Sequence, residues 1–311
     1  MAISASMVKE LREKTGAGMM DCKKALTNTD GDMDKAVEWL RENGLAKAEK
    51  KAGRIAAEGI VKTNISEDGK KAAIVEVNSE TDFVAKNEKF QDFVAAVADQ
   101  VNASSAADID AFLAEPWVGD SSKTVKEELA SMVATIGENM NIRRFEKVTC
   151  DNGIVVDYIH AGGKIGVLIA AETDNTGAEV VECLKNVAMQ IAAMNPQYLS
   201  SDDVSDEYKE REKAVLLAQA KNDPKNANKP DNIIEKMIIG RLNKELKEVC
   251  LTEQVYVKAE NKETVAKYVE SVAKAVGCNL TLKSFVRFET GEGLEKKEED
   301  FAAEVAAQMG N

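Results

Sequence analysis

The same short pattern occurs twice in this chain, and the repeat constrains its fold more than any other feature of the sequence. Gly-Ile-Val stands at residues 59–61 and again at 153–155, and Glu-Thr-Asp stands at 80–82 and again at 172–174. The two offsets are 94 and 92 residues, so they nearly agree. Such a repeat predicts two related α/β subdomains, each a small sheet backed by helices. A third, fainter copy is expected over 255–289.

Each copy has the signals of a β-hairpin followed by a loop and a helix. In the first copy, strands are expected over 60–65 and 72–77, with an Asp68-Gly69 turn between them. The second copy has Gly162-Gly163 between two strand-like runs. Apolar residues at helical spacing then follow in each copy. They are Phe90, Phe93, Val94, Val97 and Val101 in the first, and Val180, Leu184, Val187, Ala188 and Ile191 in the second.

The loops before these two helices differ in one informative way. The first loop reads Thr81-Asp82-Phe83-Val84, and the second reads Thr-Asp-Asn-Thr over 173–176. A scaffold that required phenylalanine here would keep it in both copies, so Phe83 is expected to serve a partner. Alternatively, Thr81 or Asp82 caps the next helix and Phe83 staples it. The matching Thr-Asp pair favours capping, and the residues alone leave the two interpretations of Phe83 balanced.

Residues 1 to about 45 predict a compact unit of three helices. Ser4 and Asp32 stand where helix caps are expected, and Gly44 is expected to end the third helix. Residues 46–57 are expected to form a separate connecting helix. Because so short a unit buries only a small core, its surface is a better candidate for binding than its interior is for chemistry.

The segments outside the two copies of the repeat are expected to be helical. A helix carries Val125, Leu129, Met132, Val133 and Ile136, and two antiparallel helices over 202–249 project from the body. A short last helix is expected to carry Phe301 and Val305. The predicted parts are a three-helix domain with its connecting helix (1–55), a first core subdomain (56–147), a second one (148–201 and 250–289), the protrusion (202–249) and a C-terminal module (290–311).

Charge and composition exclude several kinds of protein. The net charge is −13, with 54 acidic and 41 basic residues among 311, which disfavours direct binding to a nucleic acid. No apolar run is long enough for a membrane helix, and the N-terminus lacks the pattern of a signal peptide. The five cysteines are far apart and form no CxxC pair, so neither a zinc site nor a thioredoxin-like motif is indicated. These features predict a cytoplasmic protein with reduced, buried thiols.

No catalytic constellation emerges from the sequence. His160 is the only histidine, and its expected place at a strand end beside a turn favours an exposed or hydrogen-bonded residue over a catalytic one. The glycines at 16–18 lack the GK[ST] sequence of a phosphate loop. Arg143-Arg144 is expected to be solvated or ion-paired. We therefore expect a modular binding protein that is not an enzyme, with no cofactor and no metal.

Four stretches nevertheless indicate a family. They read LREKTGAGMMDCKKAL at 11–26, EVNSETDFVAK at 76–86, IGENMNIRR at 136–144 and RFETGEG at 287–293. In content and order they resemble the elongation factor Ts family, from about residue 5 to 308. The resemblance implies a ubiquitin-associated-like three-helix domain, two related α/β subdomains, a coiled-coil protrusion and a C-terminal helix.

The resemblance also implies a function and a set of contact residues. The family promotes nucleotide exchange on elongation factor Tu, a GTPase, by disturbing its Mg²⁺ site and releasing GDP during translation; assembly into a higher-order complex is possible. The loop implied to reach the Mg²⁺ site is Thr81, Asp82, Phe83 and Val84. The other implied contacts are Met19, Met20, Lys23, His160, Phe301 and Val305, although one of the two methionines could be ordinary core.

Three rival functions remain open at this point. The three-helix unit could make the chain an adaptor for ubiquitin-like or nascent chains, which would leave the repeats and the loop at 81–84 unexplained. An enzyme would have to use His160 or a cysteine. An RNA-binding translation factor would have to overcome the negative charge.

Overall fold

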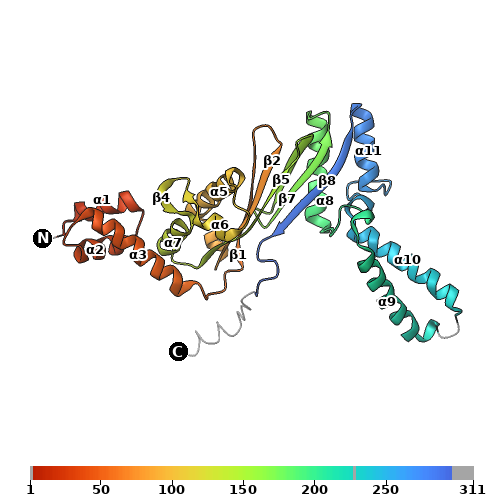
Figure 1. Ribbon diagram of the computed structural model, residues 1–311, viewed down its shortest axis with the longest axis horizontal. Helices are drawn as coiled ribbons and strands as arrows, with labels where there is room; N and C mark the ends of the chain where they lie inside the picture. The colour runs from red at the N-terminus through yellow and green to blue at the C-terminus, as the bar shows by residue number, and fades with distance from the viewer. Residues whose placement is uncertain (1–2, 227–228, 296–311) are drawn as a thin grey trace.

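The protein is elongated and mixes helices with antiparallel sheets, as the sequence predicts (Figure 1). The structure is a computed structural model that describes residues 3–226 and 229–295. Three N-terminal helices form one end, two sheets form the middle, and a hairpin of two helices projects at the other end.

The N-terminal unit consists of the three expected helices. They are α1 (Ala5–Thr15), α2 (Met19–Asn28) and α3 (Met33–Lys51). Ser4 caps α1, since its hydroxyl accepts the Met7 N–H at 3.2 Å, and Asp32 caps α3 by accepting the Lys35 N–H at 3.1 Å. Buried Leu11 and Leu26 centre a small core between the helices. The predicted caps are therefore confirmed.

The prediction that α3 ends at Gly44 is wrong. The helix continues to Lys51, so the expected connecting helix is the second half of α3 itself. Gly44 is buried where α3 packs against α7 (Val125–Ile136), and Arg41 of α3 pairs with Glu127 of α7 at 2.5 Å. Lys51 also donates to the carbonyl of Gly137. These contacts stabilise α3 beyond Gly44, a residue at which an isolated helix would tend to end.

The first sheet has the order β1-β2-β5, with antiparallel neighbours. Its strands are β1 (Glu58–Ile65), β2 (Lys71–Ser79) and β5 (Met140–Thr149). Helix α5 (Glu88–Ala103) covers one face, and all five apolar residues predicted for it are buried. The connection from α5 to β5 contains α6 (Ile109–Ala114), β3 (Pro116–Trp117), β4 (Asp120–Thr124) and α7. The prediction had no strand at β5, which lies 61 residues beyond its partner β2 in the sequence.

The second sheet has the order β6-β7-β8, again antiparallel. Its strands are β6 (Gly153–His160), β7 (Ile165–Thr173) and β8 (Leu280–Glu289). Helices α8 (Ala178–Met194) and α11 (Val265–Val276) pack on it. The expected third copy over 255–289 is not a hairpin followed by a helix. It contains α11 and then β8, which pairs with β7 as β5 pairs with β2.

The faces of the two sheets that the helices leave open pack against each other. Val61, Ile74 and Val148 of the first sheet form one apolar cluster with Val155, Leu168 and Phe288 of the second. Strands β2 and β7 are thus covered on both faces, which explains their nearly continuous apolar sequence.

A buried charge joins the two sheets. Glu76 of β2 is fully buried, and its carboxylate accepts hydrogen bonds from Arg143 at 3.0 Å, Arg144 at 2.6 Å and the Gly291 N–H at 2.8 Å. Arg144 lies over the ring of Phe288, 4.1 Å from its centroid. The adjacent Arg143 and Arg144 are therefore ion-paired, as one of the two expectations for them had it. Together with Glu76 they hold the segment after β8 against the first sheet.

The expected helical hairpin is present and thin. It consists of α9 (Asp206–Asn222) and α10 (Asp231–Val249), with short 3-10 turns at Ser201–Asp203, Pro224–Asn226 and Leu251–Glu253. A single apolar seam that includes Leu216, Ile238 and Leu242 holds the two helices together.

Four of the five cysteines are buried, and Cys278 is partly exposed. All five are unpaired. The expectation that the thiols are buried is confirmed for four of them and is wrong for Cys278.

Candidate functional site

The loop between β2 and α5 contains a one-turn helix, α4 (Asp82–Ala85), which Thr81 caps. The Thr81 hydroxyl accepts the Val84 N–H at 3.4 Å, so the predicted capping role is confirmed for Thr81. The supposed parallel in the second copy fails, because α8 begins only at Ala178 and Gly177 is its N-cap.

Within residues 3–226 and 229–295, Phe83 is the most exposed of the large hydrophobic side chains, with 80% of its surface open to solvent. A phenylalanine that stapled the helix would be packed against a neighbour, so the stapling interpretation is wrong. The adjoining Val84 points the other way and is only 8% exposed in the first core cluster. Of the loop residues 81–84, Phe83 is thus the one whose large apolar surface is exposed to solvent.

Asp82 lies beside Phe83 as an ionised carboxylate. Lys86 donates to it at 2.7 Å. This hydrogen bond, helped by the positive charges of Lys86 and Lys164, lowers the pKa of Asp82 below its ordinary value of 3.8. At neutral pH the loop therefore presents a phenyl ring next to a negative charge.

The base of this loop is fixed by two glutamates that sequence reasoning missed. Glu138, in the turn between α7 and β5, accepts the Thr81 N–H at 3.0 Å and the Thr81 hydroxyl at 2.7 Å. In return, Glu80 accepts the Asn139 N–H at 2.6 Å. Charge-assisted bonds of this kind are short and strong, so they hold α4 in one orientation. Glu138 and Thr81 are 57 residues apart, and no local pattern predicts their contact.

The second candidate surface lies on the N-terminal unit. Met19 and Met20 are 59% and 74% exposed at the start of α2, and Lys23 is exposed one turn later. The expectation that one of the methionines could belong to the core is wrong. Together with Ile3 and Val8 they line a hollow of about 650 Å³.

His160 is exposed at the end of β6, as expected, and its Nδ1 lies 2.9 Å from the Tyr158 hydroxyl. The turn that follows reaches the first sheet, where the Val61 N–H donates to the Gly163 carbonyl at 2.7 Å. The structure therefore brings the turn after His160 to the sheet that carries the Phe83 loop. Helix α2, which begins with Met19 and Met20, lies in the N-terminal unit at one end of the molecule (Figure 1). Phe301 and Val305 lie outside the described residues.

Neither a metal centre nor a membrane span is found in the described part of the chain. Within residues 3–226 and 229–295, no group of three or more His, Cys, Asp or Glu side chains could hold a metal ion. No helix in the same ranges is both long and apolar enough to cross a membrane.

Comparison with known proteins gives full-length matches. Residues 80–292 match the family model described as "Elongation factor TS", and residues 1–49 match the model described as "Elongation factor Ts, mitochondrial, N-terminal". The protein named "Elongation factor Ts" in Clostridium novyi (strain NT) is 53% identical over 307 residues, covering 99% of each chain. Its namesake in Trichlorobacter lovleyi is 54% identical over 314 residues, covering 100% of this chain and 99% of the other.

Proposed function

Since the chain belongs to the elongation factor Ts family, we propose that it binds elongation factor Tu with GDP bound and promotes release of the nucleotide. In this role it serves translation elongation in the cytoplasm and makes or breaks no covalent bond. The residues proposed to act on the partner's Mg²⁺ site are Asp82 and Phe83; Thr81 caps their turn, and Val84 anchors it in the first core cluster.

The observation that carries this proposal is the exposure of Phe83 on a fixed turn. Burying a phenylalanine side chain contributes about 1.5–3 kcal/mol relative to leaving it in water. Because Glu138 and Glu80 already orient α4, little of that free energy is spent on ordering the loop. Phe83 is therefore suited to enter a partner as a wedge.

Nucleotide release follows from linkage between the two ligands. A GTPase holds GDP partly through a Mg²⁺ ion on the phosphate oxygens, and loss of the ion leaves the phosphate charge poorly compensated. An exchange protein that binds the nucleotide-free GTPase more tightly than the GDP-bound one lowers the GTPase's affinity for GDP. By linkage, GDP lowers the GTPase's affinity for the exchange protein by the same ratio. We propose that Phe83 contacts the partner only in the conformation in which the Mg²⁺ site is disturbed.

The other surfaces are proposed to dock rather than to act on the nucleotide. Met19, Met20 and Lys23 belong to α2 of the N-terminal unit, whereas Phe83 belongs to the first sheet's loop, so the N-terminal residues can contribute affinity without displacing the ion. Their loss is expected to raise the concentration of factor needed for half-maximal exchange and to leave the maximal rate unchanged. His160, at the turn that reaches the first sheet, is proposed to form a further contact.

The test is the release of a fluorescent GDP analogue from elongation factor Tu, with excess GDP and catalytic amounts of the chain. Phe83→Ala should lower kcat/KM for exchange by about tenfold to a hundredfold, the factor that corresponds to about 1.5–3 kcal/mol. Val118→Ala is the matched control, because Val118 is also an exposed apolar residue (64%) but lies on another loop. Asp82→Asn separates the contribution of the charge from that of the ring.

Three outcomes decide between the parts of the proposal. Fast release by the wild type with loss in Phe83→Ala supports both the function and the wedge. Equal rates for the wild type and Phe83→Ala would assign exchange to other contacts. If the folded wild-type chain failed to accelerate release from a cognate partner, the proposed function would be wrong.

A further inference from the structure

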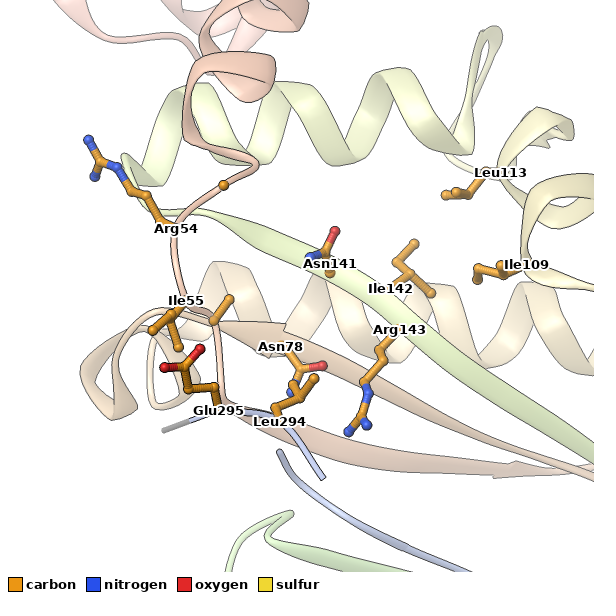
Figure 2. A pocket seen from close by; sticks show the side chains of 12 residues that line it. Arg54, Ile55, Asn78, Ile109, Leu113, Asn141, Ile142, Arg143, Leu294 and Glu295 are labelled. Carbon is orange, nitrogen blue, oxygen red and sulfur yellow. The ribbon is translucent and has the colours of Figure 1, made fainter. Parts of the chain in front are cut away.

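A groove of about 530 Å³ lies apart from the Phe83 loop, between the α3–β1 linker, helix α6 and strand β5 (Figure 2). Its apolar lining includes Ile55 from the linker, Ile109 and Leu113 from α6, and Ile142 from β5. Ile55 is 42% exposed, although it faces this hollow. An exposed apolar groove of this kind favours burial by a further segment.

Asn78 contributes to the wall of the groove, and one of its side-chain atoms is a buried hydrogen-bond acceptor without a partner in the part of the chain that the structure describes. Asn78 is 1% exposed, and its Nδ2 donates to the Glu58 carbonyl at 3.1 Å and to Glu76 at 3.0 Å. These two acceptors fix the orientation of the amide, because the opposite one would place oxygen against oxygen. The Asn78 Oδ1 then meets no donor within the described residues. Less than 1 Å² of this oxygen is accessible, so it lies behind the groove surface, and the part of the groove open to an occupant is mainly apolar.

The chain itself is directed into this groove at its C-terminal end. Leu294 and Glu295, the last residues of the described range, line it beside Asn78 and Ile55 (Figure 2). The preceding residues are anchored, since the Gly291 N–H donates to Glu76 at 2.8 Å and Arg143 donates to the Glu292 carbonyl at 2.6 Å.

Gly291 shows how closely this segment passes the linker. Its φ is +72°, and a Cβ there would lie 2.1 Å from the Ala57 carbonyl oxygen, so only glycine fits. The path of the chain from β8 to the groove is thus set by a buried carboxylate, two arginines and a glycine.

From these observations we propose that the C-terminal segment, residues 296–311, docks in the groove of its own chain. Two lysines at 296–297 and three acidic residues at 298–300 precede the apolar part of the segment, and the acidic residues would pass Arg54, a half-exposed cation that lines the groove. Phe301, Val305 and Met309 follow at a spacing of four, which gives the segment an apolar stripe for Ile109 and Leu113.

The geometry and the tether both favour this occupant over a free partner. The six residues from Glu295 to Phe301 span up to about 20 Å when extended, enough to reach α6 from the groove's open end. Because the segment is covalently attached where it must bind, its effective concentration is on the order of millimolar, and a weak contact suffices. The inference concerns the free chain and does not depend on the proposed exchange activity.

Photo-crosslinking in the full-length chain tests the proposal. A benzophenone side chain is placed at position 301, a mixture of isotopically light and heavy chains is irradiated, and the crosslinked peptides are mapped by mass spectrometry. The expected result is crosslinking within one chain to the segments around Ile55, Ile109 and Leu113. Ile55→Glu should lower the yield of these crosslinks by about tenfold, since it places a charge on the apolar wall.

The matched control is Val118→Glu, which adds the same charge at an exposed apolar residue outside the groove and should leave the yield unchanged. Circular dichroism verifies that each variant is folded. Crosslinks to a different surface, or no crosslinks at all, would overturn the proposal. Crosslinks only between light and heavy chains would assign the groove to a second copy and would equally overturn docking within one chain.

Discussion

Replacement of Glu76 by alanine should be among the most destabilising single changes in the core. The carboxylate has no exposed surface, and it accepts hydrogen bonds from Asn78, Arg143, Arg144 and the Gly291 N–H. Its removal leaves two arginines without their shared counter-ion and a backbone N–H without an acceptor. It also releases the segment after β8 from the first sheet.

The magnitude follows from how far the arginines can recover hydration. Loss of one partner of a buried ion pair costs about 3–5 kcal/mol. The side chains of Arg143 and Arg144 keep 24% and 31% of their surface exposed, so water can reach them in part. The lower end of the range, about 3 kcal/mol, is therefore expected for Glu76→Ala. Glu146→Ala is the control, because Glu146 is an exposed carboxylate on β5 and should change the free energy of unfolding by less than about 0.5 kcal/mol.

The assay is urea unfolding followed by the fluorescence of Trp117. This residue is 8% exposed and packs on Phe93 in the first core cluster, 5.6 Å between ring centroids, so it reports on the sheet that contains Glu76. Trp39→Phe, made in every chain compared, removes the other tryptophan. If Glu76→Ala lowered the free energy of unfolding by less than about 1 kcal/mol with an unchanged m-value, the reasoning about this ion pair would be refuted.

The same carboxylate gives a prediction for pH. Burial raises the pKa of Glu76, but the bonds from Gly291, Asn78 and the two arginines outweigh burial and place the pKa below the ordinary 4.5. Since the folded pKa is the lower one, this stabilisation is fully present above pH 4.5 and is lost as the pH falls through the folded value. The difference in stability between the wild type and Glu76→Gln should therefore shrink on acidification below pH 4.5. A difference that stayed constant from pH 7 to pH 3 would contradict the assignment.

Three further predictions concern α3, the loop and the thiols. Gly44→Ala should raise the free energy of unfolding by about 0.5–1 kcal/mol, because a Cβ there would meet its nearest neighbour on α7 at 3.8 Å, an ordinary contact; a lower melting temperature would contradict this. Glu138→Ala should lower kcat/KM for nucleotide exchange at least about tenfold while the chain stays folded, since two charge-assisted bonds to the loop are lost; an unchanged rate would show that the loop keeps its orientation without them. Of the five thiols, Cys278 should react first with a thiol reagent in the native protein, because the other four are buried and burial raises the pKa of Cys183 and of Cys250 to about 11; rapid reaction of several thiols before unfolding would refute this.

The parts of this fold that depend on neighbouring residues were predictable from the sequence. The caps at Ser4 and Asp32, the turn at Gly69 and the buried stripe of α5 all arise from interactions within a few positions of the chain. Their signals are therefore written in short stretches of sequence. The family could be recognised for the same reason, since its motifs are short and keep their order.

In the loop at Thr81, one side chain could be predicted from neighbouring residues and another could not. Capping by Thr81 was predictable, because donor and acceptor are three residues apart. Whether Phe83 stapled the helix or faced solvent was undecided in the sequence, since either arrangement satisfies the same local pattern. The orientation of Phe83 is set by the packing of Val84 into the core and by the hydrogen bonds between Glu138 and Thr81. Together they leave the ring of Phe83 in solvent.

Tertiary structure alone decided the contacts between distant segments. Strands β5 and β8 lack a hairpin partner next to them in the sequence, so their pairing with β2 and β7 could not be inferred from a turn. Gly44 has the sequence of a helix end, but packing against α7 outweighs its low helix propensity. No neighbour in the sequence predicts the burial of Glu76, because its partners Arg143 and Gly291 are 67 and 215 positions away. Interactions between residues close in the sequence determine which helices and strands form. Burial and charge pairing between distant segments determine how these helices and strands pack together.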